Sequence, residues 1–226
     1  MSNPNDVTNA ANGANGASAR DTLKARVNPL PEPRRTSRTG PRRIFQQLDC
    51  NAAYPYTRND YIKRLLWKLV EHTLFRLTPS RLNGVRLRML RLFGAKLAPT
   101  AVVRSSVTIM HPWLLEMGEY ACLGERVDVY NLGPIAIGHH TTVSQNCHLC
   151  AGTHDHKNPA MPLIRSAIRI GDGCWICADS FIGPDVCIGD NVIVAARTVV
   201  MRSVDADLVV AGNPAKVLTA RTMDAE

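Results

Sequence analysis

Residues 170–194, IGDGCWICADSFIGPDVCIGDNVIV, carry an aliphatic residue at every sixth position. The same spacing is present upstream at Ile137, Val143 and Leu149. A helix repeats its apolar residues about every 3.6 positions and a half-buried strand every second position, so neither element produces this pattern. A short fixed repeat is typical of a parallel β-helix, in which each repeat supplies one strand and one turn.

A second feature of the repeat is a small or β-branched residue four positions after most of the aliphatic ones. These residues are Thr141, Cys147, Thr153, Cys174, Ser180, Val186, Val192 and Thr198. Upstream, a slip of two residues after Ile135 moves the phase to Ile137. The pattern stops once, between Leu149 and Ile170, and this interruption contains His154. We expect a long loop at 152–167 that leaves the regular stack and carries the chemistry.

The chain divides into four segments. Residues 1–43 hold few large apolar residues and predict a disordered basic tail. Residues 44–96 place apolar residues at helical spacing, broken at Pro79 and Gly84, and predict a helical cap segment. Residues 97–215 predict the β-helix, and residues 216–226 predict a C-terminal tail.

The helical segment has two interpretations. A cap covers the end of a stack whose terminal coil otherwise exposes backbone and core, and we favour this one. The alternative is a basic amphipathic surface that lies on a membrane, because Lys63, Arg64 and Lys68 interleave with the apolar residues.

Composition limits the class of protein further. The chain has 226 residues, 45% of them hydrophobic but 5% aromatic, which suits a narrow aliphatic core. Its net charge of +8 is concentrated before residue 105, where it suits contact with phosphate, nucleic acid or an anionic membrane. With seven cysteines, no secretory signal and no apolar run long enough to span a bilayer, we expect a cytoplasmic protein, with the inner face of the membrane as an alternative.

Four segments carry a resemblance to a known family. They are LFGAK at 92–96, YNLGPIAIG at 130–138, GTHD at 152–155 and GNPAK at 212–216. With the repeats, they resemble the hexapeptide-repeat acyltransferases, in the branch of the colanic acid (exopolysaccharide) biosynthesis acetyltransferases. The resemblance covers about residues 59–218. It implies a mainly β fold, a left-handed parallel β-helix of hexapeptide repeats with an N-terminal helical segment, and it implies a homotrimer.

The resemblance also implies a reaction. Family members transfer acetyl from acetyl-CoA, so we expect an O-acetyltransferase that acts on a sugar or lipid-linked sugar in exopolysaccharide biosynthesis. The acceptor hydroxyl needs a base as it attacks the thioester directly, and histidine suits this role because its unperturbed pKa is about 6.5. His154 matches the catalytic histidine of the family. Asp155 and His156 are weaker candidates for orienting it, since family members often use a backbone carbonyl instead.

Ligand contacts are carried over in the same way. The residues that match CoA contacts of the family are Ala178, Ala196, Met201, Arg202 and Lys216. The family usually has Thr-Lys where this chain has Met201-Arg202, so the charge is kept and a hydroxyl is lost. The residues expected on the acceptor side are Asn131, Asp128, Tyr130 and Trp175, and a purely structural role for Trp175 is an equal alternative.

The cysteines offer a competing interpretation, because Cys147-x-x-Cys150 and Cys174-x-x-Cys177 together match a zinc array. However, Cys147 and Cys174 occupy the small-residue position of the repeat, where a buried thiol serves as a small hydrophobe. The three faces of a coil also spread the four thiols apart. We therefore expect no metal.

Three other functions remain open at this stage. One is a non-catalytic hexapeptide-repeat scaffold, and another is an acetyltransferase for a small amine or xenobiotic. A third is a nucleic-acid or membrane binder that uses the basic N-terminal half. We expect no nucleic acid partner, and we retain peripheral membrane contact as a second role.

Overall fold

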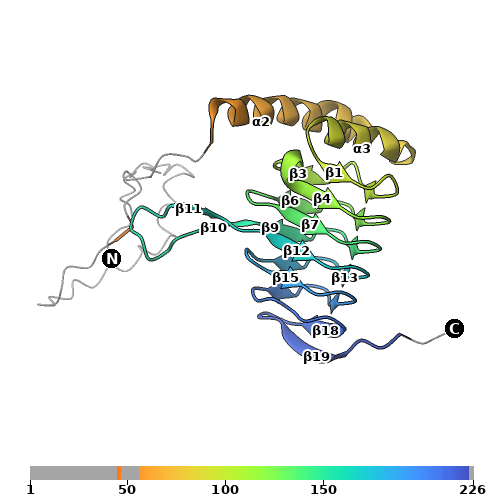
Figure 1. Ribbon diagram of the computed structural model, residues 1–226, viewed down its shortest axis with the longest axis vertical. Helices are drawn as coiled ribbons and strands as arrows, with labels where there is room; N and C mark the ends of the chain where they lie inside the picture. The colour runs from red at the N-terminus through yellow and green to blue at the C-terminus, as the bar shows by residue number, and fades with distance from the viewer. Residues whose placement is uncertain (1–44, 47–55, 224–226) are drawn as a thin grey trace, which may run out of the picture. The chain divides into compact units, whose positions relative to one another are not determined.

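A computed structural model describes residues 45–46 and 56–223, and the predicted tail at 1–43 lies outside them. Short strands wind into a stack of coils with three sheets along its sides (Figure 1). The first sheet contains β1 (Lys96–Leu97), β4 (Leu115–Met117), β7 (Ile135–Ile137), β12 (Ile168–Ile170) and β15 (Cys187–Ile188). The second contains β2 (Val102–Val103), β5 (Cys122–Leu123), β8 (Thr142–Val143), β13 (Trp175–Ile176), β16 (Ile193–Val194), β18 (Leu208–Ala211) and β19 (Lys216–Ala220). The third contains β3 (Thr108–Ile109), β6 (Asp128–Tyr130), β9 (His148–Cys150), β14 (Phe181–Ile182) and β17 (Val199–Val200).

The aliphatic residue of each repeat points into the stack. Those predicted from Ile137 to Val200 are at most 3% exposed. Neighbouring coils pair in parallel, with Ile176 opposite Val194 and Ile182 opposite Val200. Each six residues therefore make one strand and one turn, with the aliphatic side chain of the strand inside the stack. The mainly β class and the parallel β-helix with an N-terminal helical segment are confirmed.

The slip of two residues has a local cause. Ile135 and Ile137 lie in the same strand, β7, and both are buried. Coils at the helical end repeat after 20 residues, as in the bonds between His111 and Asn131, whereas later coils repeat after 18, as between Asp172 and Asp190. The longer coils have longer turns between the third and first sheets. The phase therefore changes within one strand, and no coil is interrupted.

The small residue of most repeats is buried, at a turn between two strands of a coil. Thr141, Ser180 and Thr198 are at most 1% exposed, and the hydroxyl of Ser180 donates to the carbonyl of Ala195 on the next coil. Thr153 was assigned to this position wrongly. It is exposed in the strand β10 (Gly152–His154), because the chain has already left the stack there.

The C-terminal end of the stack is closed by a strand. Residues 216–220 were predicted as part of a loose tail, and this is wrong, because β19 pairs antiparallel with β18. The pairing gives β18 a partner on its outer side and makes β19 the edge strand of the second sheet. The tail is reduced to the residues after Ala220.

The N-terminal helical layer comprises α2 (Arg58–Val70), the π-helical turn η2 (Glu71–Phe75), the 3₁₀ turn η3 (Ser80–Leu82) and α3 (Asn83–Leu92). Thr57 caps α2 through a reciprocal capping box with Asp60. Gly84 does not separate two helices as predicted but lies inside α3, and the break falls near Pro79 alone. After α3, Gly94 takes the left-handed conformation, at φ 96°, and the short turn η4 (Pro112–Leu114) follows in the first coil. None of the described helices is long and apolar enough to cross a bilayer.

Side chains of the helical layer bond to the main chain of the first coil. Trp67 donates its indole N–H to the carbonyl of Ile109 at 2.7 Å, and a carboxylate oxygen of Glu71 accepts from the N–H of the same residue at 2.8 Å. The guanidinium of Arg86 donates to the carbonyl of Val103 at 2.7 Å. β2 and β3 are edge strands, so these contacts pair backbone groups that an edge otherwise leaves open.

Candidate active site

The interrupted region forms a β-hairpin that projects from the stack (Figure 1). β10 pairs antiparallel with β11 (Leu163–Arg165), so that His154 faces Leu163 and Gly152 faces Arg165. The predicted loop at 152–167 is thus a two-stranded arm with a short irregular tip. The arm leaves the third sheet directly after β9, and its root bonds to the neighbouring coil where the N–H of Ala151 donates to the carbonyl of Tyr130 at 3.0 Å.

His154 stands on this arm with an exposed side chain. Its Nδ1 lies 2.5 Å from the carbonyl oxygen of Met161, on the other side of the hairpin tip. A carbonyl oxygen only accepts hydrogen bonds, so Nδ1 carries the proton and donates it to Met161. Nε2 of the neutral ring is then left with a lone pair, which is the form of histidine that takes a proton from a substrate.

The partner of Nδ1 is thus a backbone carbonyl, the alternative to Asp155 and His156 that the family resemblance suggested. Asp155 accepts from the backbone N–H of Lys157 at 3.0 Å, and its own N–H donates to Pro162 across the hairpin. His156 is exposed. Met161, whose backbone takes the left-handed conformation at φ 47°, was not foreseen from sequence, because any residue type supplies a carbonyl.

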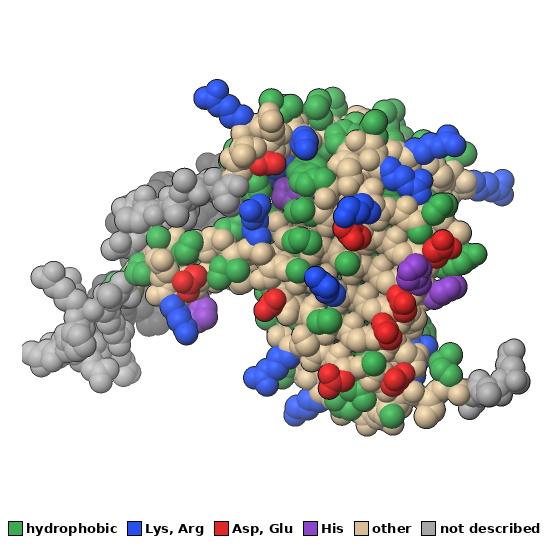
Figure 2. Space-filling model, viewed as in Figure 1, with side chains coloured by type: hydrophobic (Ala, Val, Ile, Leu, Met, Phe, Trp, Pro, Cys, Tyr) green, Lys and Arg blue, Asp and Glu red, His purple; other side chains and the backbone are tan. Residues whose placement is uncertain are grey.

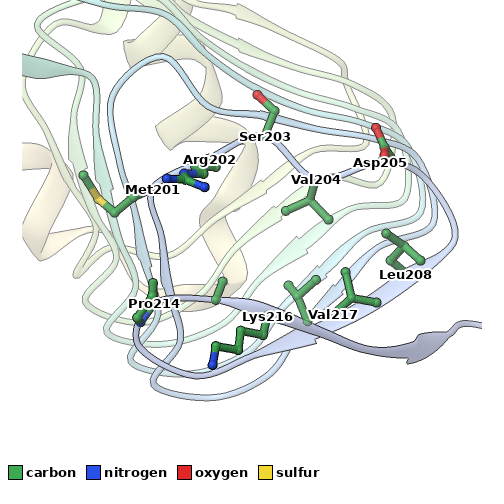
Figure 3. Close-up of a pocket in the computed structure, with 11 residues that line it drawn as sticks. Met201, Arg202, Ser203, Val204, Asp205, Leu208, Pro214, Lys216 and Val217 are labelled. Carbon is green, nitrogen blue, oxygen red and sulfur yellow. The ribbon is translucent and has the colours of Figure 1, made fainter.

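Three of the predicted CoA residues line one pocket. Met201 and Arg202 follow β17, and Lys216 opens β19, on different sides of a pocket of about 580 Å³ (Figure 3). The remaining wall is largely apolar, with Val204, Leu208 and Val217, and it also contains the carboxylate of Asp205. Two cations beside an apolar wall suit a ligand that combines phosphate groups with a less polar arm.

The other two predicted CoA residues lie on a different edge of the stack. Ala178 and Ala196 occupy equivalent turns between the second and third sheets, on consecutive coils. Trp175 is half exposed on the second sheet, and its indole N–H donates to Ser144 at 2.9 Å. His154, by contrast, lies on the arm that leaves the edge between the third and first sheets. One chain therefore does not bring these residues to His154.

The acceptor residues divide in a similar way. Asp128 and Tyr130 lie partly exposed on β6 of the third sheet, beside the root of the arm. Nδ1 of His148, on the next strand, is 3.8 Å from a carboxylate oxygen of Asp128. These three side chains share one outer surface with the base of the hairpin.

Asn131 does not have the predicted contact with an acceptor. Its side chain is fully buried, with Oδ1 accepting from the N–H of His111 at 2.8 Å and Nδ2 donating to the carbonyl of the same residue at 2.6 Å. Both halves of the amide thus hold one coil to the next. Burial lowers the pKa of His111, and its Nδ1 lies 2.9 Å from the carbonyl of Asn131.

The cysteines follow the repeat. Cys147 and Cys174 are buried on different edges of the stack, with their thiols near the carbonyls of Cys177 and Gly189 respectively. Burial raises the pKa of Cys147 to about 11, so this thiol is protonated at neutral pH and is a poor metal ligand. In the part of the chain that the structure describes, no three His, Cys, Asp or Glu side chains gather as a metal site.

Comparisons with known proteins agree with this fold. A family model described as "Bacterial transferase hexapeptide (six repeats)" matches residues 167–202. The chain is 44% identical over 160 residues to the "Putative colanic acid biosynthesis acetyltransferase WcaF" of Escherichia coli (strain K12), covering 71% of this chain and 88% of that protein.

Two solved structures share the fold. The galactoside acetyltransferase in complex with coenzyme A is 21% identical with a TM-score of 0.68, over 75% of this chain and 86% of that one. The hexapeptide-repeat acetyltransferase VCA0836 from Vibrio cholerae O1 biovar eltor, complexed with acetyl coenzyme A, is 22% identical with a TM-score of 0.67, over 78% and 96%.

Proposed function

Because the chain belongs to the hexapeptide-repeat acetyltransferases, in the colanic acid biosynthesis branch, we propose that it transfers acetyl from acetyl-CoA to a sugar hydroxyl in exopolysaccharide biosynthesis. It is an acetyl-CoA-dependent acetyltransferase, and the hydroxyl acceptor is the proposed part. The observation that carries the proposal is His154, held on an exposed arm with Nδ1 bonded to Met161 and Nε2 left as the basic nitrogen.

The proposed chemistry is a single direct transfer. Nε2 of His154 takes the proton of the acceptor hydroxyl while its oxygen attacks the carbonyl carbon of the thioester. The bond between that carbon and sulfur breaks, and the CoA thiolate leaves and takes up the proton that His154 holds. The Met161 carbonyl supports this cycle, since it stabilises the positive charge that the imidazole ring carries in between.

The donor is proposed to lie along the outside of the stack. Arg202 and Lys216 supply positive charge for its phosphates, and the small side chains of Ala178 and Ala196 leave the backbone open to its pantetheine arm. On the acceptor side we propose Asp128 and Tyr130, which lie beside the arm, and Trp175 from the second sheet.

The separation of the proposed donor contacts from His154 within one chain supports the proposal of a homotrimer. Ala178 and His154 lie on different edges of one chain, so a donor that touches both must lie between two copies. In a closed ring of three, each copy offers its Ala178 edge to the arm of its neighbour.

Mixing inactive His154→Ala chains with inactive Ala178→Trp chains is then expected to restore activity, because some interfaces in the mixed ring carry neither substitution. No restored activity in verified mixed oligomers would contradict the shared site.

The proposed acceptor class is tested by transfer of radiolabelled acetyl from acetyl-CoA to a panel of free, nucleotide-linked and lipid-linked sugars. The expected product is an ester, which mild alkali cleaves, at one hydroxyl of a sugar. An alkali-stable amide on an amino sugar or a small amine would overturn the hydroxyl assignment.

We propose the cytoplasm, at the inner face of the membrane, as the place of reaction.

A further inference from the structure

The helical layer exposes apolar side chains on the side that faces away from the coils. In α2, Ile62, Leu65, Leu66 and Leu69 follow the spacing of one helix face, and Leu65 and Leu69 are 72% and 64% exposed. On the opposite face, Trp67 is fully buried against the first coil. The layer therefore has two apolar faces, and the described part of the chain covers one of them.

This exposed face continues beyond α2. The large apolar residues that the layer exposes are Tyr61, Ile62, Leu65, Leu66, Leu69, Leu74, Leu77, Leu82, Val85 and Leu92, which we call the apolar face. Figure 2 shows hydrophobic side chains gathered along the layer, with Lys and Arg side chains among them. On the coils, large exposed apolar residues are fewer and scattered. A contiguous apolar surface of this kind marks a site of association with a partner or a membrane.

The charge of the layer selects the partner. Residues 57–92 contain nine Lys and Arg and two Asp and Glu. One of the two acids, Glu71, is buried, and the other, Asp60, bonds to the N–H and hydroxyl of Thr57. The exposed cations include Arg58, Arg81 and Arg88. Arg76, Arg91 and Lys63 are also exposed but contact the coils, at the hydroxyl of Thr108, the carbonyl of Leu97 and the ring of Trp113 respectively. A second copy of the same surface would bring like charges together, whereas an anionic bilayer accepts the leucines and pairs with the cations.

We propose that the apolar face is a membrane-docking surface for anionic lipid. The face is preformed, because Trp67, Glu71 and Arg86 fix the layer to the first coil from the other side. Docking would also hold the reactive arm close to the lipid headgroups. The arm follows β9, two strands along the third sheet from β3, which at about 4.8 Å per strand places its root about 10 Å from the strand that meets the layer.

The proposal is tested by sedimentation of the full chain with vesicles of phosphatidylcholine alone and of phosphatidylcholine mixed with phosphatidylglycerol. We expect binding to the anionic vesicles, weaker binding to neutral ones, and release as salt is raised, since screening weakens the attraction. Replacing Leu65 and Leu69 together by Gln is expected to weaken vesicle binding at least about tenfold, because it removes two buried apolar side chains from the lipid.

Leu218→Gln is the matched control, since Leu218 is 64% exposed on β19 at the other end of the stack and its loss should leave vesicle binding unchanged. Unchanged melting temperature shows that the double variant is folded. Vesicle binding equal in wild type and double variant, or none in wild type, would overturn the proposal. Self-association that the double variant abolishes, without vesicle binding, would assign the face to a second copy. The assay contains no acetyl-CoA, so its outcome is independent of the proposed acetyl transfer.

Discussion

The helical layer and the hairpin are the two elements that lie outside the coil stack. Their polar side chains form hydrogen bonds to different parts of the molecule. In the layer, Glu71 and Arg86 are buried and bond to the main chain of the first coil. In the hairpin, His154 is exposed and bonds to the main chain of the hairpin itself. Side chains thus hold the layer in place, whereas paired backbone holds the hairpin and leaves its side chains for chemistry. Substitutions of the anchoring side chains of the layer should therefore cost stability, and substitution of His154 on the hairpin should cost turnover.

The largest expected effect on stability comes from Arg86→Ala. Its guanidinium donates to the buried carbonyls of Val103 and Thr78 and to the partly buried carbonyls of Pro79 and Ser80, and the shorter side chain removes all these bonds. We expect a loss of about 3 kcal/mol in the free energy of unfolding, measured by urea denaturation. Arg88→Ala, on the exposed side of α3, is the control and should change it by less than about 0.5 kcal/mol. Equal losses in the two variants would contradict the anchoring role of Arg86.

A smaller effect on the free energy of unfolding is expected from the protonation of His111, which is buried near the helical layer. Burial lowers its folded pKa, so in the window just below the unfolded value of about 6.5 the unfolded chain binds the extra proton. This contribution to stability is present above about pH 6.5 and is lost as the pH falls through the folded pKa, by at most about 1.4 kcal/mol per pH unit. Urea midpoints across this range should fall less steeply in His111→Gln than in wild type. Identical slopes would show that His111 does not titrate between the two states, and His156→Gln is the exposed control.

The smallest effect concerns the place where the helical layer and the hairpin meet. The guanidinium of Arg165, at the base of the arm, lies 5.8 Å from the ring centroid of Tyr56, just before α2. A double-mutant cycle with Tyr56→Leu and Arg165→Gln should give a coupling of about 0.5–1 kcal/mol in unfolding free energy. The same cycle with Arg169→Gln, on β12, should give none. Zero coupling at Arg165 would mean that the layer and the arm are independent.

The sequence predicted the parts of the fold that repeat. The aliphatic period identified the residues of the core, since a side chain that points into a narrow stack must be apolar in every coil. It showed a shift of two residues after Ile135 but not its cause, which is the longer turn near Asn131. The strand β19 was missed because its side chains are all exposed and its pairing is made by backbone.

The candidate site was predictable only where chemistry depends on side chains. His154 followed from its motif and from the interruption of the repeat, and its role stays a proposal. Met161 contacts His154 through its backbone carbonyl. Because every residue has such a carbonyl, the residue type at 161 did not predict this contact. The motif suggested that Asn131 binds the acceptor. In the stack, however, both the oxygen and the nitrogen of its side-chain amide form hydrogen bonds to the neighbouring coil.

The most direct test of the account compares turnover and folding in His154→Ala. With His156→Ala as the control on the same arm, we expect the first variant to transfer acetyl about a hundredfold to ten-thousandfold more slowly than wild type, because it lacks the base. Its melting temperature and its affinity for acetyl-CoA should stay unchanged, since the side chain is exposed and the hairpin is held by backbone. A His154→Ala enzyme that transfers acetyl at close to the wild-type rate would contradict the assignment.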